Sequence, residues 1–232
     1  MIVPRRPAEM LAVVAVKLSK LPRRVVFIGG ATTGLLLTDS AAPEVRSTTD
    51  VDVIVPVSSY REYAMDVGRE LRALGAREDT SEDAPLCRWI LDGVHVDVMA
   101  PNEQVLGFTN RWYRDALDHV EERRLPDGTV ILVTTGPLFL ATKIEAFRGR
   151  GDGGYLASKD MEDITVLDGR PELVEEVAAT ELELRSFLRE VFADWLARRE
   201  FAEVVAGHLL GDIDSQARAE VILERMASIA QG

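Results

Sequence analysis

Three aspartates are the residues of this sequence best suited to metal chemistry. Asp50 and Asp52 lie two apart in a valine-rich run that favours a strand. Residues two apart on a strand point to the same face, so these carboxylates lie side by side. Asp97 interrupts a second valine-rich run and adds a carboxylate on a nearby strand. Three such groups repel one another unless a cation neutralises them. Their oxygens suit Mg²⁺, or Mn²⁺ in its place, bound partly through a substrate's phosphates.

A glycine pair lies upstream of the aspartates, where Gly29 and Gly30 follow an apolar run. Glycines between a strand and a helix let backbone N–H groups approach an anion at the helix N-terminus. A phosphate-binding turn beside a carboxylate metal site is the equipment of phosphoryl or nucleotidyl transfer. Further candidates for nucleotide contacts are Thr33, Arg46 and Thr48.

Each of these features also has a purely structural interpretation. Gly29 and Gly30 alone are more often a tight turn between a strand and a helix. Asp50 also suits a solvent-exposed strand end. Asp52 and Asp97 interrupt valines of strands that should be buried, where an unpaired carboxylate is costly. The order of the glycines and the three acids along the chain therefore favours the metal site.

The elements that position these residues follow from hydrophobic periodicity and turn signals. The patterns predict strands at residues 24–28 and 51–55, with a helix from residue 31 to 37 between them. Ser58 or Ser59 caps a further helix that runs to residue 74. The turn pairs Asp92-Gly93 and Asp127-Gly128 predict two hairpins, formed by residues 86–99 and 121–133. Together these elements predict an α/β (α+β) fold with a small mixed sheet.

The chain becomes helical after Gly136. Helices are expected at residues 138–147, 158–167, 201–210 and 215–230. Thr180 and Glu183 have capping-box spacing, and they begin a helix with one apolar face. The residues of that face are Leu184, Phe187, Leu188, Val191, Phe192 and Trp195.

Composition limits the classes of function. The 232 residues carry 27 Lys and Arg against 39 Asp and Glu, a formal net charge of −12, which argues against a wide, sequence-blind nucleic-acid surface. More than half of that excess lies after Pro171. The single cysteine, Cys87, excludes an internal disulfide framework and a Cys-rich zinc site. No apolar run approaches the length of a membrane span, and we expect a cytoplasmic protein with no membrane partner.

The order of motifs resembles the DNA polymerase β-like nucleotidyltransferase superfamily. That superfamily shares an apolar strand, Gly-Gly or Gly-Ser, a helix, Asp-x-Asp on the next strand and a third acid on a later one. Gly29-Gly30, Asp50-Val-Asp52 and Asp97 match in this order. The second glycine replaces a frequent serine, so Thr32 or Thr33 would supply the missing hydroxyl. The resemblance implies a nucleotidyltransferase palm in residues 1–135, and a helical region in 136–232 that completes the cleft.

A narrower resemblance, to the AbiEii/MenT-type branch of bacterial toxins, depends on two helices. These helices carry Ala-Thr-Lys143 and Lys159-Asp160-Met-Glu-Asp163. The resemblance implies that Asp50 and Asp52 bind metal, Asp97 activates the acceptor hydroxyl, Lys143 holds the triphosphate and Asp160 lies at the nucleotide site. On structural grounds, Lys143 also suits a lysine that reaches solvent from an apolar helix. Asp160 and Asp163 also suit a helix cap or a pair with Lys159.

The resemblance implies transfer of a nucleoside monophosphate from a nucleoside triphosphate to an RNA, with the tRNA 3′-end as the leading acceptor and a cognate antitoxin as a further partner. The alternatives are a small molecule such as an aminoglycoside or a protein as acceptor, and a catalytically inactive nucleotide-binding module. A non-enzymatic regulator is the least favoured class. RNA requires basic residues gathered on one side, for which the candidates are Arg46, Arg111, Arg114, Arg123, Arg124, Arg148, Arg150 and Lys159.

Overall fold

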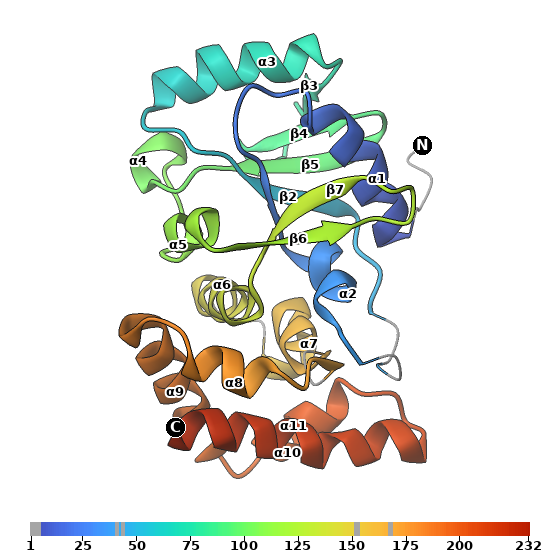
Figure 1. Cartoon of the computed structure of the whole chain (residues 1–232), viewed down its shortest axis with the longest axis vertical. Coiled ribbons are helices and arrows are strands. Elements are labelled where there is room, and N and C mark those ends of the chain that lie inside the picture. Colours follow the sequence, from blue (N-terminus) through green and yellow to red (C-terminus); the bar gives the residue numbers. More distant parts are fainter. Residues whose placement is uncertain (1–5, 40–41, 43–44, 151–153, 167–168) are drawn as a thin grey trace. The chain divides into compact units, whose positions relative to one another are not determined.

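The structure is a computed structural model that describes residues 6–39, 42, 45–150, 154–166 and 169–232 (Figure 1). The chain forms two compact units. The first comprises Met1–Thr32 and Arg46–Thr135, and the second comprises Thr33–Val45 and Gly136–Gly232. The predicted domains, 1–135 and 136–232, differ from these units in the placement of residues 33–45.

A mixed sheet organises the first unit (Figure 1). Among the described residues it has seven strands in the order β3-β4-β5-β2-β1-β7-β6. β2 pairs with β5, and β1 with β7, in parallel, and the other neighbours are antiparallel. The predicted mixed α/β fold is confirmed. The strands are β1 (Val26–Ile28), β2 (Asp50–Ile54), β3 (Arg77–Glu78), β4 (Arg88–Leu91), β5 (Val94–Met99), β6 (Val120–Arg124) and β7 (Val130–Thr134).

Both predicted hairpins are present. β4 and β5 are joined through Asp92 and Gly93, whose φ angles of 48° and 80° are typical of a two-residue turn that matches the twist of the strands. β6 and β7 are joined through a turn in which Gly128 has a φ of 91°. The positive φ angles explain Asp92, Gly93 and Gly128, because most other residues are strained in this conformation.

Short helices pack on the sheet of the first unit. The helix α1 (Pro7–Leu18) contacts β2 and β5 with a face that includes Leu11, Val14 and Leu18. The helix α5 (Tyr113–Asp118) forms a buried cluster with β1 and β2 through Ala116 and Leu117. The other helical segments of this unit are η1 (Gly30–Thr32), the π-helical η2 (Glu62–Val67), α3 (Gly68–Ala73) and α4 (Glu103–Leu106).

In this part of the chain the structure corrects one predicted helix and confirms the start of another. The helix expected from residue 31 to 37 is a 3-10 turn, η1, followed by the single-turn α2 (Thr33–Leu36). The start expected at Ser58 or Ser59 is confirmed. The Ser59 hydroxyl accepts a hydrogen bond from the Glu62 amide at 3.2 Å, and the Glu62 carboxylate accepts from the Ser58 amide and hydroxyl at 2.9 Å. Such reciprocal bonds satisfy amides that a helix start leaves unpaired.

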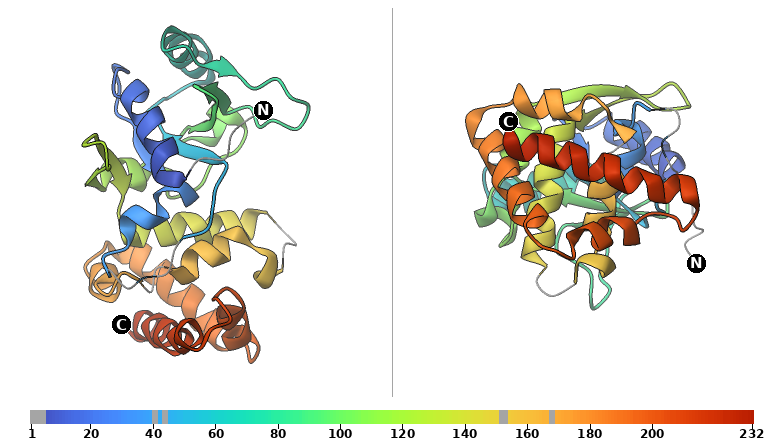
Figure 2. Two further views of the ribbon diagram at one scale, coloured as in Figure 1. Left: turned by 90° about the vertical axis from the view of Figure 1, so that its right-hand side faces the viewer. Right: turned by 90° about the horizontal axis from the view of Figure 1, so that it is seen from below.

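Helices make up most of the second unit. The first nine residues of α6 are buried, and α6 contacts α7, α8 and α9. α11, the long red helix in Figure 2, packs along α9. The predicted helix 158–167 corresponds to α7, with Leu167 outside the described residues. The elements are α6 (Gly136–Gly149), η3 (Tyr155–Ala157), α7 (Lys159–Val166), α8 (Leu173–Ala178), α9 (Leu182–Leu196), α10 (Phe201–Gly207) and α11 (Ile213–Gln231).

The helix α9 confirms one prediction and corrects another. All six residues of its predicted apolar face are buried. The predicted capping box is wrong, because the Thr180 hydroxyl donates to the Val177 carbonyl at 2.8 Å, and Glu181 is the residue at the N-cap. Thr180 therefore completes the end of α8 rather than the start of α9.

Residues 33–39 are tied to the second unit by polar bonds. The guanidinium of buried Arg170 donates to the Leu36 carbonyl at 2.9 Å and to both oxygens of Glu176 at 2.7 and 2.6 Å. The Thr38 and Asp39 amides both donate to the Gly169 carbonyl. These bonds explain why this segment groups with the helices.

Among the described residues, no helix is long and apolar enough to cross a membrane.

Candidate active site

Four side chains form one row across the sheet of the first unit. Arg88 on β4 is directly opposite Asp97 on β5, and Asp97 is in register with Asp52 on β2. Asp52 is in turn in register with Ile28 on β1. Residues in register on neighbouring strands share a face. The predicted closeness of Asp97 to the two aspartates of β2 is therefore a consequence of strand order, and Arg88 belongs to the same group.

Arg88 binds two of the three aspartates. Its Nε and NH2 donate to the two oxygens of Asp97 at 2.8 and 2.7 Å, and NH2 also donates to Asp50 Oδ2 at 3.1 Å. Hydrogen bonds to Asp97, supported by the charges of Asp97 and Asp50, hold the pKa of the Arg88 guanidinium above its ordinary value. The Asp97 side chain is only 8% exposed. A carboxylate buried to this degree needs such a partner.

Gly29 makes room for the carboxylate of Asp52. The residue has a φ of +74°, and a Cβ placed on it would lie 1.9 Å from Asp52 Oδ2. Any side chain at this position would displace the carboxylate. Gly29 therefore has a role that the sequence did not indicate. Its lack of a side chain leaves space for the carboxylate of Asp52, which we predict to bind metal.

The other predicted nucleotide ligands have various surroundings. The Thr48 hydroxyl donates to Asp50 Oδ1 at 2.9 Å, and Arg46 NH1 donates to the Ser47 carbonyl at 3.2 Å. The Thr32 hydroxyl donates to the Gly29 carbonyl at 2.9 Å. The Thr33 hydroxyl is buried and has no hydrogen-bond partner in the described part of the chain. Thr33 therefore keeps a hydroxyl that could contact a phosphate.

The carboxylate oxygens of this sheet face are of the kind that a divalent cation prefers. They belong to Asp50, Asp52 and Asp97 at neighbouring positions, with Gly29 leaving space beside Asp52. In the arrangement seen, two of the three carboxylates are bound to Arg88. Within the described residues, no group of three acidic, His or Cys side chains is gathered as a metal centre.

Lys143 and Asp160 belong to a buried ion cluster of the second unit. Lys143 Nζ on α6 lies 3.1 Å from Asp160 Oδ1 and 2.6 Å from Asp163 Oδ2 on α7. Arg150 NH1 lies 2.6 Å from the other oxygen of Asp160. Lys143, Asp160 and Asp163 are 7%, 2% and 1% exposed. This geometry differs from that of a lysine reaching solvent, because the ammonium lies between two buried carboxylates and joins α6 to α7.

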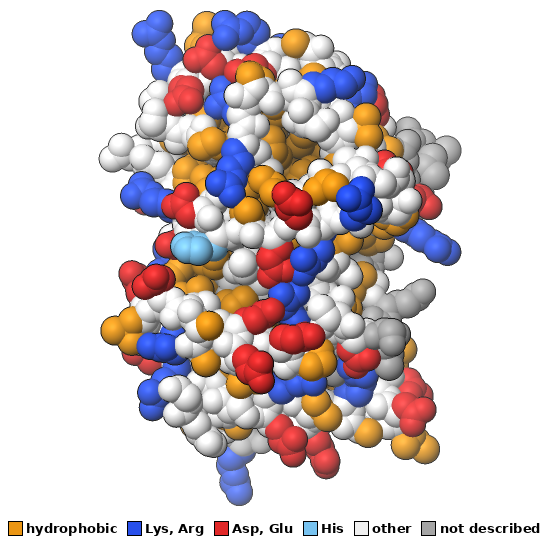
Figure 3. All heavy atoms as spheres, in the orientation of Figure 1, with side chains coloured by type: hydrophobic (Ala, Val, Ile, Leu, Met, Phe, Trp, Pro, Cys, Tyr) orange, Lys and Arg blue, Asp and Glu red, His pale blue; other side chains and the backbone are white. Residues whose placement is uncertain are grey.

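Several arginines proposed to bind RNA are engaged within the protein. Arg123 pairs with Glu121, and Arg150 with Asp160. The guanidinium of Arg111 lies 4.6 Å from the centre of the Trp112 ring. On the face shown in Figure 3, basic and acidic side chains are interspersed and form no continuous basic band. Phosphate contacts by these arginines would therefore compete with existing partners.

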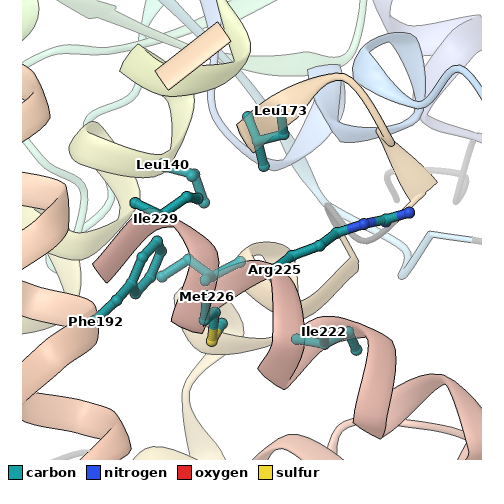
Figure 4. A pocket seen from close by; sticks show the side chains of 8 residues that line it. Leu140, Leu173, Phe192, Ile222, Arg225, Met226 and Ile229 are labelled. Atoms are coloured by element: carbon teal, nitrogen blue, oxygen red, sulfur yellow. The ribbon is translucent and has the colours of Figure 1, made fainter. Parts of the chain in front are cut away.

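A small cavity in the second unit has the wrong lining for a polar substrate. Its volume is about 20 Å³, and it is lined by apolar side chains of α6, α7, α9 and α11, with Leu173 at the start of α8 and the stem of Arg225. Figure 4 shows the Arg225 guanidinium pointing away from the apolar side chains. A space of this size holds at most about one water, and an apolar lining leaves it dry. It is a packing gap.

Arg88 is the site residue that sequence analysis missed. A two-residue turn at Asp92 and Gly93 fixes the hairpin register, so counting outward from the turn pairs residue 88 with residue 97.

Cys87, the neighbour of Arg88 in the sequence, is buried. Burial, followed by the negative charges of Asp97 and Asp52, raises the pKa of its thiol to about 12.

Comparison with solved structures supports the fold. A crystal structure described as an antigenic nucleotidyltransferase-like protein from Paracoccidioides brasiliensis is similar to this chain, with a TM-score of 0.51 and 18% sequence identity. The alignment covers 88% of this chain and 95% of the other. No protein-family model and no curated protein matches the chain. The likeness shows a nucleotidyltransferase-like fold, and the AbiEii/MenT-type branch stays a prediction.

Proposed function

We propose that this chain transfers a nucleoside monophosphate from a nucleoside triphosphate to an acceptor hydroxyl. The observation that carries the proposal is the row of carboxylates on one sheet face, Asp50, Asp52 and Asp97, in a nucleotidyltransferase-like fold. Of two Mg²⁺ ions bound there, or Mn²⁺ in their place, one would lower the pKa of the acceptor hydroxyl and the other would neutralise the leaving pyrophosphate.

The residues of the first unit then have distinct roles. Asp50, Asp52 and Asp97 would hold the cations, and Gly29 leaves room for the Asp52 carboxylate. The acceptor oxygen bonds to the α-phosphorus, the bond from that phosphorus to the bridging oxygen breaks, and pyrophosphate leaves. Asp97 receives the proton of the acceptor hydroxyl. The backbone amide of Gly30 is proposed to contact phosphate.

The acceptor that we propose first is an RNA, with the 3′-end of tRNA as the leading candidate and a toxin–antitoxin system as the setting. This choice depends on the resemblance of the Lys143 and Asp160 helices to the AbiEii/MenT-type branch. The second candidate is a small cationic molecule such as an aminoglycoside. The net charge of −12 and the interspersed charges of Figure 3 favour it over a polyanion.

The experiment is a transfer assay with each α-³²P-labelled nucleoside triphosphate and Mg²⁺ or Mn²⁺. Total RNA, purified tRNA, protein and aminoglycosides are supplied as separate acceptors. Asp52→Asn should abolish labelling, and Asp66→Asn, a change at a half-exposed helix position, should not. Labelled tRNA should decline steeply as salt rises, because each phosphate contact depends on counterion release.

The outcomes separate the candidates. If only an aminoglycoside is labelled, or if RNA labelling does not change with salt, the proposal of an RNA-binding surface is wrong. If wild type and Asp52→Asn label equally, the carboxylates have no role in catalysis. If no acceptor is labelled but the protein still binds the triphosphate, the chain is a catalytically inactive nucleotide-binding module.

A further inference from the structure

One arginine donates three hydrogen bonds to carboxylates that are proposed to hold metal. Arg88 donates twice to Asp97 and once to Asp50, with distances from 2.7 to 3.1 Å. A guanidinium that meets both oxygens of a carboxylate forms one of the stronger and more specific polar contacts in proteins. It also relieves part of the repulsion between acids that share a sheet face.

The position of Arg88 is a consequence of the backbone. The tight turn of the β4–β5 hairpin places residue 88 opposite residue 97, and register places residue 97 beside residue 52. The Arg88 side chain is 22% exposed and that of Asp50 is 29% exposed. The guanidinium therefore lies on the carboxylate face but is still open to solvent.

A cation and this guanidinium would compete for the same oxygens. Both are positively charged, and a divalent cation ligated by Asp50 and Asp97 would lie within a few ångströms of Arg88. Like charges at this separation repel strongly at a partly buried site. Binding of the cation thus favours release of Arg88 from at least one aspartate.

We propose that Arg88 is a positioning residue that holds Asp97 and Asp50 in the cation-free protein and releases them when the divalent cation binds. The inference rests on the proposed function, because it concerns the same carboxylates. Arg88 keeps the acids in place, and its release is part of forming the active site. Once released, its planar fork of N–H donors is free to bind a phosphate of the incoming triphosphate.

The test measures binding of Mn²⁺ alone, without nucleotide, by electron paramagnetic resonance of the free ion. Arg88→Gln removes the competing charge and should bind Mn²⁺ about 10-fold or more tightly than wild type, since the cation no longer displaces charge-assisted hydrogen bonds. Arg88→Lys keeps the charge without the bidentate contact and should be intermediate. The matched control is Arg23→Gln, because Arg23 makes a similar bidentate contact to Glu70 at 2.7 and 2.9 Å. Its Mn²⁺ affinity should equal that of wild type.

A second measurement uses wild type and does not require Arg88→Gln to fold. The Arg88 Nε–H resonance in ¹⁵N-arginine-labelled protein, assigned by its loss in Arg88→Lys, should shift as Mg²⁺ is added. An unchanged resonance at saturating Mg²⁺, or Mn²⁺ affinity equal to or below wild type in Arg88→Gln, would overturn the inference. Transfer activity is a separate readout. If wild type transfers nucleotide but Arg88→Gln binds Mn²⁺ no more tightly than wild type, only the inference about Arg88 is wrong. If Arg88→Gln binds Mn²⁺ more tightly but wild type shows no transfer, only the proposed function is wrong.

Discussion

The substitution Lys143→Met decides whether this lysine stabilises the helices or binds a triphosphate. The structure places its ammonium between Asp160 and Asp163, at 3.1 and 2.6 Å, and all three residues are less than a tenth exposed. Met preserves most of the volume but leaves the buried carboxylates without this cation. Removing one partner of a buried ion pair costs about 3–5 kcal/mol. For a chain of this size, that loss corresponds to a fall in Tm of roughly 6–20 °C.

The assay is urea unfolding of the full chain without nucleotide, followed by circular dichroism. Lys159→Met, at an exposed position of α7, is the control and should change stability by no more than about 0.5 kcal/mol. The double variant Lys143→Met/Asp163→Asn should be less destabilised than the sum of its single changes, because Asn removes the charge left unpaired. Triphosphate affinity is measured by calorimetry at a temperature at which every variant is folded.

One result would refute the structural reasoning. If Lys143→Met unfolds at the same urea concentration as wild type but no longer binds the triphosphate, the buried ion pairs contribute nothing and the role implied by the resemblance is correct. If stability falls while triphosphate affinity is unchanged, Lys143 joins α6 to α7 and does not bind nucleotide.

The other predictions concern the first unit. In urea unfolding, Gly29→Ala should destabilise the fold by more than Gly75→Ala. Both glycines have positive φ, but a Cβ at Gly29 would collide with the Asp52 carboxylate, whereas nothing lies within 4 Å of a Cβ at Gly75. Equal losses would show that Asp52 moves aside at no cost. The Cys87 thiol, with its pKa raised to about 12, should stay protonated in the folded state when the unfolded thiol ionises above about pH 8.5. Folding stability should therefore fall by roughly 1.4 kcal/mol between pH 7.5 and 9.5, and this fall should be absent in Cys87→Ala; an equal pH dependence in both proteins would contradict the assignment.

Local signals accounted for the sheet of the first unit. The Asp-Gly pairs at residues 92–93 and 127–128 are turn signals, and Asp92, Gly93 and Gly128 have the positive φ that few other residues adopt, so both hairpins could be predicted. Alternation then placed Asp50 and Asp52 on one face. The position of Asp97 beside them required strand order, which depends on the parallel pairing of β2 with β5 and cannot be read from either strand alone.

The missed features depend on contacts distant in sequence. Residues 33–39 group with the helices because Arg170 and Gly169 bind their backbone, more than 130 residues away along the chain. The partners of Lys143 on α7 lie three residues apart, at 160 and 163, a spacing that puts both on one helix face. The sequence predicts Asp160 at the nucleotide site, with a helix cap or a pair with Lys159 as the structural alternative for both acids, because the spacing does not show which helix they meet.

The two ion clusters have a similar composition and differ in exposure, which separates their roles. Each places one basic group between two aspartates, Arg88 in the first unit and Lys143 in the second. The Lys143 side chain is 9% exposed and its acids are 2% and 1% exposed, so another cation can replace it only if the helices open. The Arg88 side chain is 22% exposed and Asp50 is 29% exposed, so solvent and ions reach that group in the folded state. Exchange of a basic side chain for a metal ion is therefore expected at the sheet face and not between α6 and α7.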